Sequence, residues 1–145
     1  MLHTTNYFSH CRWPRFFLPL ALLVGYFAPV QAALIKKDVE YFLAGIPYVG
    51  YLVYEDSGAA KKPGILVAHN WLGVTQETKD KADQLAQLGY VAFAVDIYGK
   101  NNRPKDQSEA REKTTFFKKD RLVLRARMQQ GLSQLSKQNN VDSNK

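Results

Sequence analysis

Apolar residues fill two continuous runs in the middle of the chain, residues 65–68 and 90–95. Runs of this length are typical of strands buried on both faces, as in parallel sheets. Between them, residues 75–88 carry apolar positions along one face of a helix, and Gly89 stands where a glycine commonly ends one. The pattern predicts a parallel strand–helix–strand unit over residues 63–98, with both strands fully buried.

The segment before that unit has the pattern of a hairpin. Residues 37–43 alternate between polar and apolar, and residues 46–54 form a second β-rich run after Ala44-Gly45. Pro47 suits the start or the edge of a strand, because proline cannot donate a ladder hydrogen bond. Two such runs around a glycine-containing turn predict an antiparallel pair.

Helical spacing returns after a polar loop at residues 99–104. Residues 108–117 predict a short helix and residues 120–137 a longer one. Gly131 on the longer helix allows close approach to a sheet. Residues 139–145 have the composition of a helix-to-strand connection with no strand after it. The longer helix is expected to carry Leu124, Met128, Leu132 and Leu135 on its apolar face and Arg121, Arg125 and Arg127 on its solvated side.

The N-terminus has the pattern of a cleaved export signal. Arg12 and Arg15 precede an uncharged apolar run at residues 16–28, and Val30-Gln31-Ala32 supplies the small residues of a cleavage site. The run is about half of the ~20 residues needed to span a bilayer, which disfavours a retained anchor. We therefore predict a signal peptide at residues 1–32, cleavage between Ala32 and Ala33, and a periplasmic or secreted protein with no stable membrane anchor.

Composition and charge narrow the class of the remaining segment, residues 33–145. The chain is 46% hydrophobic and 23% charged, which is typical of a globular domain. Its formal charge of +7 includes Arg12 and Arg15, and no basic stripe with interleaved aromatics accompanies it. We therefore expect no nucleic-acid partner. Cys11 is the only cysteine, so a chain cleaved after Ala32 has no disulfide and no cysteine metal site.

The predicted order is hairpin, strand, loop, helix, strand, loop and helix, and these residues resemble the dienelactone hydrolase family. The matching segments are Gly50-Tyr51-Leu52, residues 63–73 (PGILVAHNWLG), residues 82–99 (ADQLAQLGYVAFAVDIYG), and Asp120-Arg121 with Arg125-Ala126-Arg127. The resemblance implies an α/β fold, the N-terminal half of an α/β-hydrolase. That half is an antiparallel hairpin followed by parallel βαβα in three layers (α/β/α), and it ends before the nucleophile elbow.

The resemblance also implies an activity, hydrolysis of a small ester or lactone by a nucleophile, a histidine and an aspartate, with no cofactor and no metal. Neither Gly-x-Ser-x-Gly nor Gly-x-Cys-x-Gly occurs in the sequence. We therefore expect a truncated form that lacks the catalytic triad and is inactive alone. The alternative is a non-catalytic remnant, or a module that binds a small molecule or a partner with a hydrolase-like half-sheet.

The site residues implied by the resemblance lie in the loops after the two buried strands. Residues 69–73 occupy the loop that donates a backbone N–H to the oxyanion hole, and the Trp71 N–H is the candidate donor. Asn70 stands where family members commonly have a glutamate, and an amide cannot ionise to activate a thiol. The candidates for lining a substrate pocket are His69, Asn70, Trp71, Tyr98 and Arg103.

Each of these residues also has a structural interpretation. His69 has the position of a hydrogen-bonding residue at a strand end rather than a catalytic base. Trp71 and Tyr98 fit buried packing equally well. Arg103 belongs to a polar loop, although an arginine beside the pocket could hold a substrate carboxylate. Asp96, at the end of the second buried strand, is expected to anchor the loop that follows it.

Overall fold

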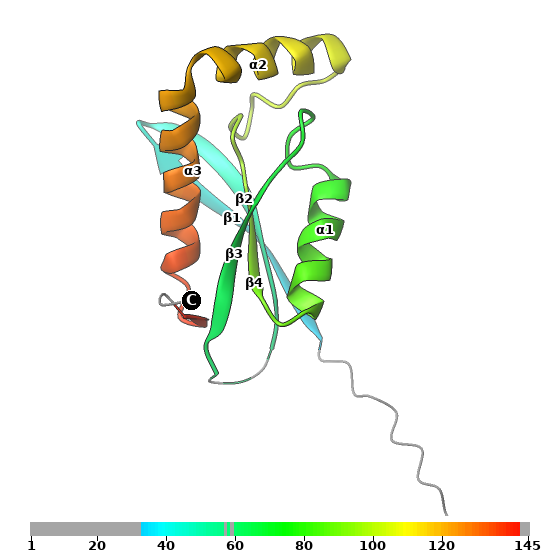
Figure 1. The fold of residues 1–145 in the computed structure, drawn as a ribbon, viewed down its shortest axis with the longest axis vertical. Coiled ribbons are helices and arrows are strands. Elements are labelled where there is room, and N and C mark those ends of the chain that lie inside the picture. The colour runs from blue at the N-terminus through cyan, green and yellow to red at the C-terminus, as the bar shows by residue number, and fades with distance from the viewer. Residues whose placement is uncertain (1–32, 57, 59, 143–145) are drawn as a thin grey trace, which may run out of the picture. The chain divides into compact units, whose positions relative to one another are not determined.

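The structure, a computed structural model, describes residues 33–56, 58 and 60–142. The predicted signal peptide, residues 1–32, lies outside the described residues. One mixed sheet has the strand order β1-β2-β4-β3-β5 and carries three helices (Figure 1). The elements are β1 (Leu34–Leu43), β2 (Ile46–Glu55), β3 (Lys62–Ala68), α1 (Gln76–Gln87), β4 (Val91–Val95), α2 (Gln107–Lys119), α3 (Arg121–Ser136) and β5 (Val141–Asp142).

The predicted hairpin is confirmed, and β1 begins three residues earlier than its sequence pattern indicated. β1 and β2 pair antiparallel, with Leu43 opposite Ile46. The two turn residues, Ala44 and Gly45, have positive φ angles of 50° and 77°. A two-residue turn with two positive φ angles matches the twist of the flanking strands, which explains its position between two long strands.

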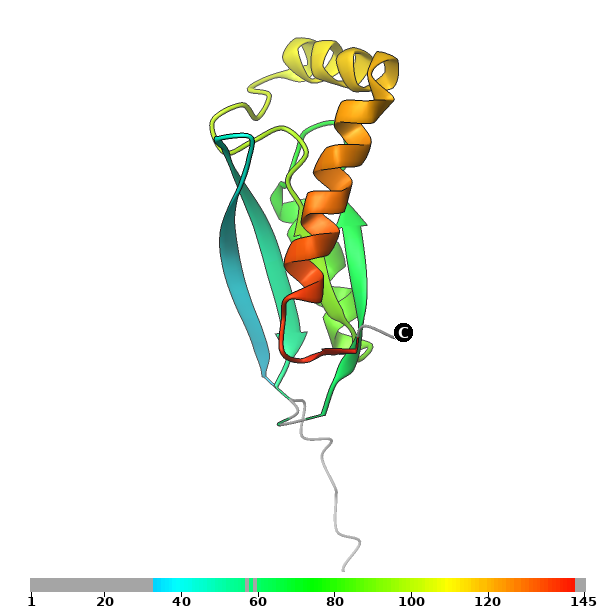
Figure 2. The same cartoon turned by 90° about the vertical axis from the view of Figure 1, so that its left-hand side faces the viewer.

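The predicted strand–helix–strand unit is also present, as β3, α1 and β4. β3 and β4 pair parallel, and all five residues of β4 are buried. Val91, Phe93 and Val95 belong to the hydrophobic cluster under α3, whereas Ala92 and Ala94 belong to the cluster under α1. Because β4 is covered on both faces, the arrangement has three layers, α/β/α. Figures 1 and 2 show α1 and α3 on opposite faces of the sheet.

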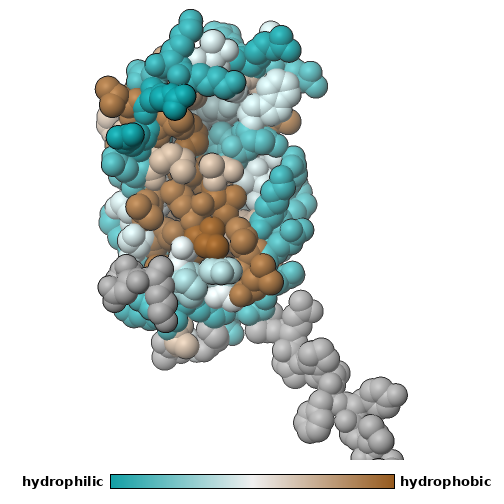
Figure 3. All heavy atoms as spheres, viewed as in Figure 1, coloured by the Kyte–Doolittle hydropathy of each residue, from teal (hydrophilic) through white to brown (hydrophobic). Residues whose placement is uncertain are grey.

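The expectation that both central strands are fully buried is wrong for β3, whose residues are half-buried or exposed. On the side away from β4, β3 is paired with β5 through Lys62 and Pro63 alone. The edge of residues 64–68 therefore has no paired strand among the described residues. In Figure 3 apolar surface is visible over β3, in the view of Figure 1.

The last described residues correct a second expectation. Val141 and Asp142 form the short strand β5, parallel to β3, in a segment for which no strand was predicted. The backbone N–H of Lys62 also donates to Asn140 O at 2.8 Å. A two-residue strand is defined by its partner, so its own sequence gives almost no signal.

Both C-terminal helices occur where the sequence predicts them, and aspartates cap them. The Asp106 carboxylate accepts from the Glu109 N–H at the start of α2, and the Asp120 carboxylate accepts from the Val123 N–H at the start of α3. Each cap satisfies one of the backbone donors left free in a first helical turn.

The face of α3 that packs on the sheet differs from the predicted one at two positions. Gly131 and Leu135 are buried, but Leu132 is half exposed (50%). Arg127 is not on the solvated side. Its guanidinium lies 4.7 Å from the Phe117 ring centroid and 5.4 Å from that of Tyr48, and it donates to Ile97 O. The backbone of α3 thus approaches the sheet at Gly131, as predicted, and Leu135 packs in the core beside it.

Replacing Gly131 with alanine is expected to lower the free energy of unfolding by about 2 kcal/mol, since overpacking a core commonly costs 1–3 kcal/mol. A Cβ at this position would lie 2.8 Å from the Cβ of Val95, the last residue of the buried strand β4. The gain of up to about 1 kcal/mol in helix propensity opposes the clash but does not outweigh it. Urea unfolding followed by circular dichroism measures the change.

The matched control is Gln129→Ala, an exposed position of the same helix, which is expected to change stability by no more than about 0.5 kcal/mol. A more stable Gly131→Ala variant would contradict the close packing of α3 on β4.

No helix among the described residues is long and apolar enough to cross a membrane.

Candidate functional site

The candidate site lies where β3 and β4 end. In open α/β sheets, ligands bind in the crevice outside the carboxyl ends of the parallel strands. The structure has a cavity of about 490 Å³ at this place, between the two strand ends and the helices α2 and α3. It is lined by Ala68, His69, Asn70, Trp71, Ile97, Tyr98, Thr114, Phe117, Lys118, Arg121, Leu124 and Met128.

His69, the first residue after β3, is engaged through both ring nitrogens. Its Nε2 accepts from the Ile97 N–H at 3.1 Å, and its Nδ1 lies 2.5 Å from Asn70 O. An amide N–H can only donate and a carbonyl can only accept, so the ring is neutral with its proton on Nδ1. Burial lowers the pKa of His69, which favours the same neutral form. The geometry supports the strand-end role and leaves no free nitrogen for a base.

Asn70 organises the turn that follows. Its Oδ1 accepts from the Leu72 N–H at 2.9 Å, and its backbone carbonyl accepts from the Gly73 N–H at 3.2 Å. Its amide donates to Glu77 of α1 at 3.0 Å. The side chain therefore holds the loop together by an Asx-type turn. Gly73 closes the turn with a φ of 90°, a conformation that favours glycine.

The Trp71 N–H differs from its neighbours in this turn. The N–H groups of Leu72 and Gly73 are bonded within the loop, whereas that of Trp71 has no acceptor among the described residues. Trp71 is 39% exposed and lines the cavity. A backbone donor without a partner beside a cavity is the arrangement that an oxyanion hole requires.

Tyr98 lines the same cavity but is buried, and it supports the loop. Its hydroxyl donates to Trp71 O at 2.9 Å. Its ring centroid lies 4.7 Å from that of His69 and 5.7 Å from that of Phe117. Tyr98 therefore both packs in the interior and lines the cavity, so the two interpretations hold together.

Asp96 is completely buried at the end of β4 and anchors the loop after it. One carboxylate oxygen accepts from the N–H groups of Tyr98 and Gly99, each at 3.0 Å. The other accepts from the Val49 N–H at 3.2 Å and lies 3.7 Å from the Arg103 guanidinium. These contacts confirm the prediction that Asp96 anchors the loop after β4.

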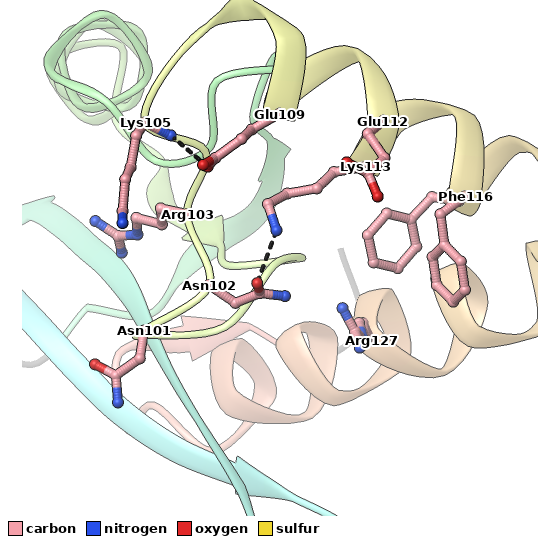
Figure 4. A pocket seen from close by; sticks show the side chains of 10 residues that line it. Asn101, Asn102, Arg103, Lys105, Glu109, Glu112, Lys113, Phe116 and Arg127 are labelled. Carbon is pink, nitrogen blue, oxygen red and sulfur yellow. Dashed lines mark hydrogen bonds between the residues drawn. The ribbon is translucent and has the colours of Figure 1, made fainter.

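The structure places Arg103, a candidate for lining a substrate pocket, outside this cavity. Its guanidinium donates to Val49 O at 3.0 Å and to Val74 O at 3.3 Å, beside Asp96. It borders a separate polar cavity of about 610 Å³ under α2, shown in Figure 4. Through these two hydrogen bonds Arg103 ties β2 to the loop before α1, while its buried Nε has no hydrogen-bond partner among the described residues.

Sequence reasoning missed two cations at the candidate site. Lys118 near the end of α2 and Arg121 at the start of α3 both line the cavity. The available signal was the position of these residues in the chain. The junction of the two helices follows the end of β4 by some 25 residues and folds back over it. No cluster of three potential metal ligands occurs among the described residues.

Comparison with known proteins identifies the family. The family model described as "Dienelactone hydrolase family" matches residues 49–145. The chain belongs to the dienelactone hydrolase family. Its fold is accordingly that of the family, an α/β-hydrolase arrangement.

Two solved structures of dienelactone hydrolase type are similar to this member of the family. The protein titled m3DLH has a TM-score of 0.73 and 28% identity, over 77% of this chain and 47% of its own. The dienelactone hydrolase-like promiscuous phosphotriesterase P91, from metagenomic libraries, has a TM-score of 0.72 and 26% identity, over 79% of this chain and 47% of its own.

A curated relative, "Protein usf" of Aquifex pyrophilus, is 36% identical over 63 residues, which are 41% of this chain and 26% of that protein. The chain thus spans about half the length of the two similar structures and about a quarter of this relative.

Proposed function

We propose that this chain supplies the oxyanion-loop half of a hydrolase site for small ester or lactone substrates. The observation that carries the proposal is the Trp71 N–H, which has no acceptor among the described residues and lies in a hydrogen-bonded turn beside the cavity at the strand ends. A donor in this position meets the negative charge that develops on a carbonyl oxygen under attack. Such a donor typically contributes about 3–4 kcal/mol to the transition state.

The attack itself needs a nucleophile within reach of a base, and the sequence offers no nucleophile turn of either known pattern. No Gly-x-Ser-x-Gly or Gly-x-Cys-x-Gly motif occurs in the 145 residues, and both nitrogens of His69 are engaged. We therefore propose that the nucleophile, the acid and the catalytic histidine come from further residues of the same fold, and that the 145 residues alone do not turn over substrate. Asn70, whose side chain holds the turn, does not supply a carboxylate for thiol activation.

The walls of the cavity indicate the kind of substrate. Phe117, Leu124 and Met128 supply apolar surface, and Lys118 and Arg121 supply positive charge. This combination favours a small, largely apolar ester or lactone that carries a negative group. The similar protein P91 is named for phosphotriesterase activity. Phosphotriester hydrolysis also develops charge on an oxygen, so phosphotriesters are a second substrate class to assay.

Export of this protein through a cleaved signal peptide also remains a prediction. It depends on residues 1–32, which lie outside the described residues, and it would place the activity in the periplasm or the medium.

The test begins with the nucleotide sequence after the codon for Lys145, read in all three frames. We expect an apolar strand followed by a nucleophile turn, Gly-x-Cys-x-Gly or Gly-x-Ser-x-Gly. A chain continued through that turn is expected to hydrolyse 4-nitrophenyl acetate, whereas the 145 residues alone are not expected to exceed the buffer rate. Absence of the turn in every frame, or an inactive continued chain that is folded, would overturn the proposal.

The alternative is a module that binds a small molecule without turnover. It is favoured by one observation, that the described residues by themselves line an open cavity beside Trp71. Saturable binding of phenyl acetate with no hydrolysis, in a protein without the nucleophile turn, would support the alternative.

A further inference from the structure

The candidate oxyanion donor is part of the peptide unit between Asn70 and Trp71. A trans peptide is planar, so its C=O and its N–H point in opposite directions, and the described residues contain no cis peptide bond. Fixing the carbonyl therefore fixes the direction of the N–H. The Asn70 carbonyl accepts two hydrogen bonds, from His69 Nδ1 at 2.5 Å and from the Gly73 N–H at 3.2 Å.

These two contacts differ in what they connect. The Gly73 N–H belongs to the same turn and moves with it. The His69 ring, by contrast, is held from outside the loop, because its Nε2 accepts from the Ile97 N–H at 3.1 Å at the end of β4. The Ile97 carbonyl in turn accepts a hydrogen bond from the Arg127 guanidinium of α3. The ring also lies against Tyr98, with 4.7 Å between the ring centroids.

The neighbouring peptide unit, between Trp71 and Leu72, is held separately. Its carbonyl accepts from the Tyr98 hydroxyl at 2.9 Å, and its N–H donates to Asn70 Oδ1 at 2.9 Å. Tyr98 and the Asn70 side chain thus support the loop without acting on the peptide that carries the free donor. His69 is the side chain that joins that peptide to the sheet.

We propose that His69 is the positioning residue of the oxyanion hole, bridging Ile97 and the Asn70 carbonyl so that the Trp71 N–H faces the cavity. This role rests on the proposed function of the site. His69 acts through the 70–71 peptide and exchanges no proton with a substrate. The bridge needs one donating and one accepting nitrogen, so it exists only with the neutral ring that carries its proton on Nδ1.

Protonation of His69 is therefore expected to break the bridge, since Nε2 can then no longer accept from the Ile97 N–H. Burial and Arg103 disfavour the charged ring, whereas the hydrogen bond to the Asn70 carbonyl and the charge of Asp96 favour it. Lys118 and Arg121 line the same cavity and add positive charge on the side of α2 and α3. Burial has the largest effect and lowers the pKa of His69, so the bridge is intact at neutral pH and is lost only as the pH falls through this lowered pKa.

The first test measures the direction of the Trp71 N–H in the isotopically labelled 145-residue chain by residual dipolar couplings. In the wild type the coupling is expected to fit the alignment tensor of the sheet. In His69→Leu it is expected to fall at least twofold as the direction averages, while the couplings of β4 stay unchanged. His69→Gln, whose amide can both donate and accept, is expected to restore part of the coupling. An unchanged Trp71 coupling in a folded His69→Leu chain would overturn the proposal.

The second test uses the wild type alone, so it does not depend on how a variant folds. Imidazole nitrogen shifts are expected to show a protonated Nδ1 and an unprotonated Nε2 at neutral pH. On acidification, the Trp71 coupling is expected to fall with the same midpoint as the titration of His69, below pH 6.5. A proton on Nε2, or a Trp71 N–H that does not respond while His69 titrates, would refute the bridge.

Neither measurement needs a substrate, so the two proposals can fail separately. If the couplings behave as expected but the continued chain lacks hydrolytic activity, the bridge is upheld and the proposed function is overturned. In an active continued chain, His69→Leu is expected to lower kcat at least tenfold with little change in KM. An unchanged kcat would overturn the positioning role and leave the hydrolase proposal standing.

Discussion

Replacing Asp96 with alanine is expected to lower the free energy of unfolding by about 3–5 kcal/mol, because it removes the acceptor of three backbone donors and each buried donor left unpaired costs about 1–3 kcal/mol. The carboxylate is completely buried and is the acceptor for the N–H groups of Val49, Tyr98 and Gly99. The substitution leaves these donors and the nearby Arg103 guanidinium without their common partner. Urea unfolding of the variant and the wild type measures the loss.

Two variants separate this effect from a general loss of charge. Asp96→Asn keeps one oxygen for Tyr98 and Gly99 and is expected to cost less than alanine. Asp56→Ala removes an exposed carboxylate that accepts from the Gly58 N–H, and it is expected to cost no more than about 0.5 kcal/mol. A loss below 1 kcal/mol for Asp96→Ala would show that the loop after β4 is held by other contacts.

Replacing Trp71 with proline in a continued chain that carries the nucleophile is expected to lower kcat roughly 100- to 1,000-fold, the usual effect of deleting one oxyanion donor. Proline has no N–H, so the substitution removes the proposed donor itself. The Trp71 carbonyl that accepts from Tyr98 is still present in the variant. Steady-state hydrolysis of 4-nitrophenyl acetate measures kcat and KM.

The matched control is Trp71→Ala, which removes the indole but keeps the N–H. It is expected to change KM more than kcat, since the half-exposed side chain lines the cavity. Circular dichroism shows whether both variants keep the fold. Equal losses of kcat in the proline and alanine variants would assign the effect to the indole and contradict the role of the backbone donor.

The elements of the fold follow closely from local patterns. The hairpin, α1, β4, α2 and α3 were all predicted from the spacing of apolar residues, because a buried face imposes its period on the sequence. The boundaries differ by a few residues, as at β1, which begins at Leu34. β5 was missed, since two residues carry no period and their strand exists only through pairing with β3.

Side chains that act over long sequence distances were predicted less well. From the sequence, Arg103 was interpreted as a loop residue and Arg127 as a solvated helix residue. Yet Arg103 reaches Val49 O, and Arg127 reaches Ile97 O, 30 residues away. Gly131 meets the sheet as predicted, but Leu132, which was expected on the same face of α3, is half exposed. Periodicity identifies an apolar face but does not fix its rotation to within one residue.

The sequence by itself determined the order of the elements, the resemblance to the dienelactone hydrolases and the loop in which the oxyanion donor is expected. These features depend on residues that are neighbours along the chain. Only the tertiary structure decided that His69 joins β4 to that loop, that Arg103 lies outside the cavity and that the Trp71 N–H has no acceptor among the described residues. The physical reason is that a hydrogen-bond partner is chosen by direction and distance in space, and several of the partners here lie 28 or more residues apart in the chain.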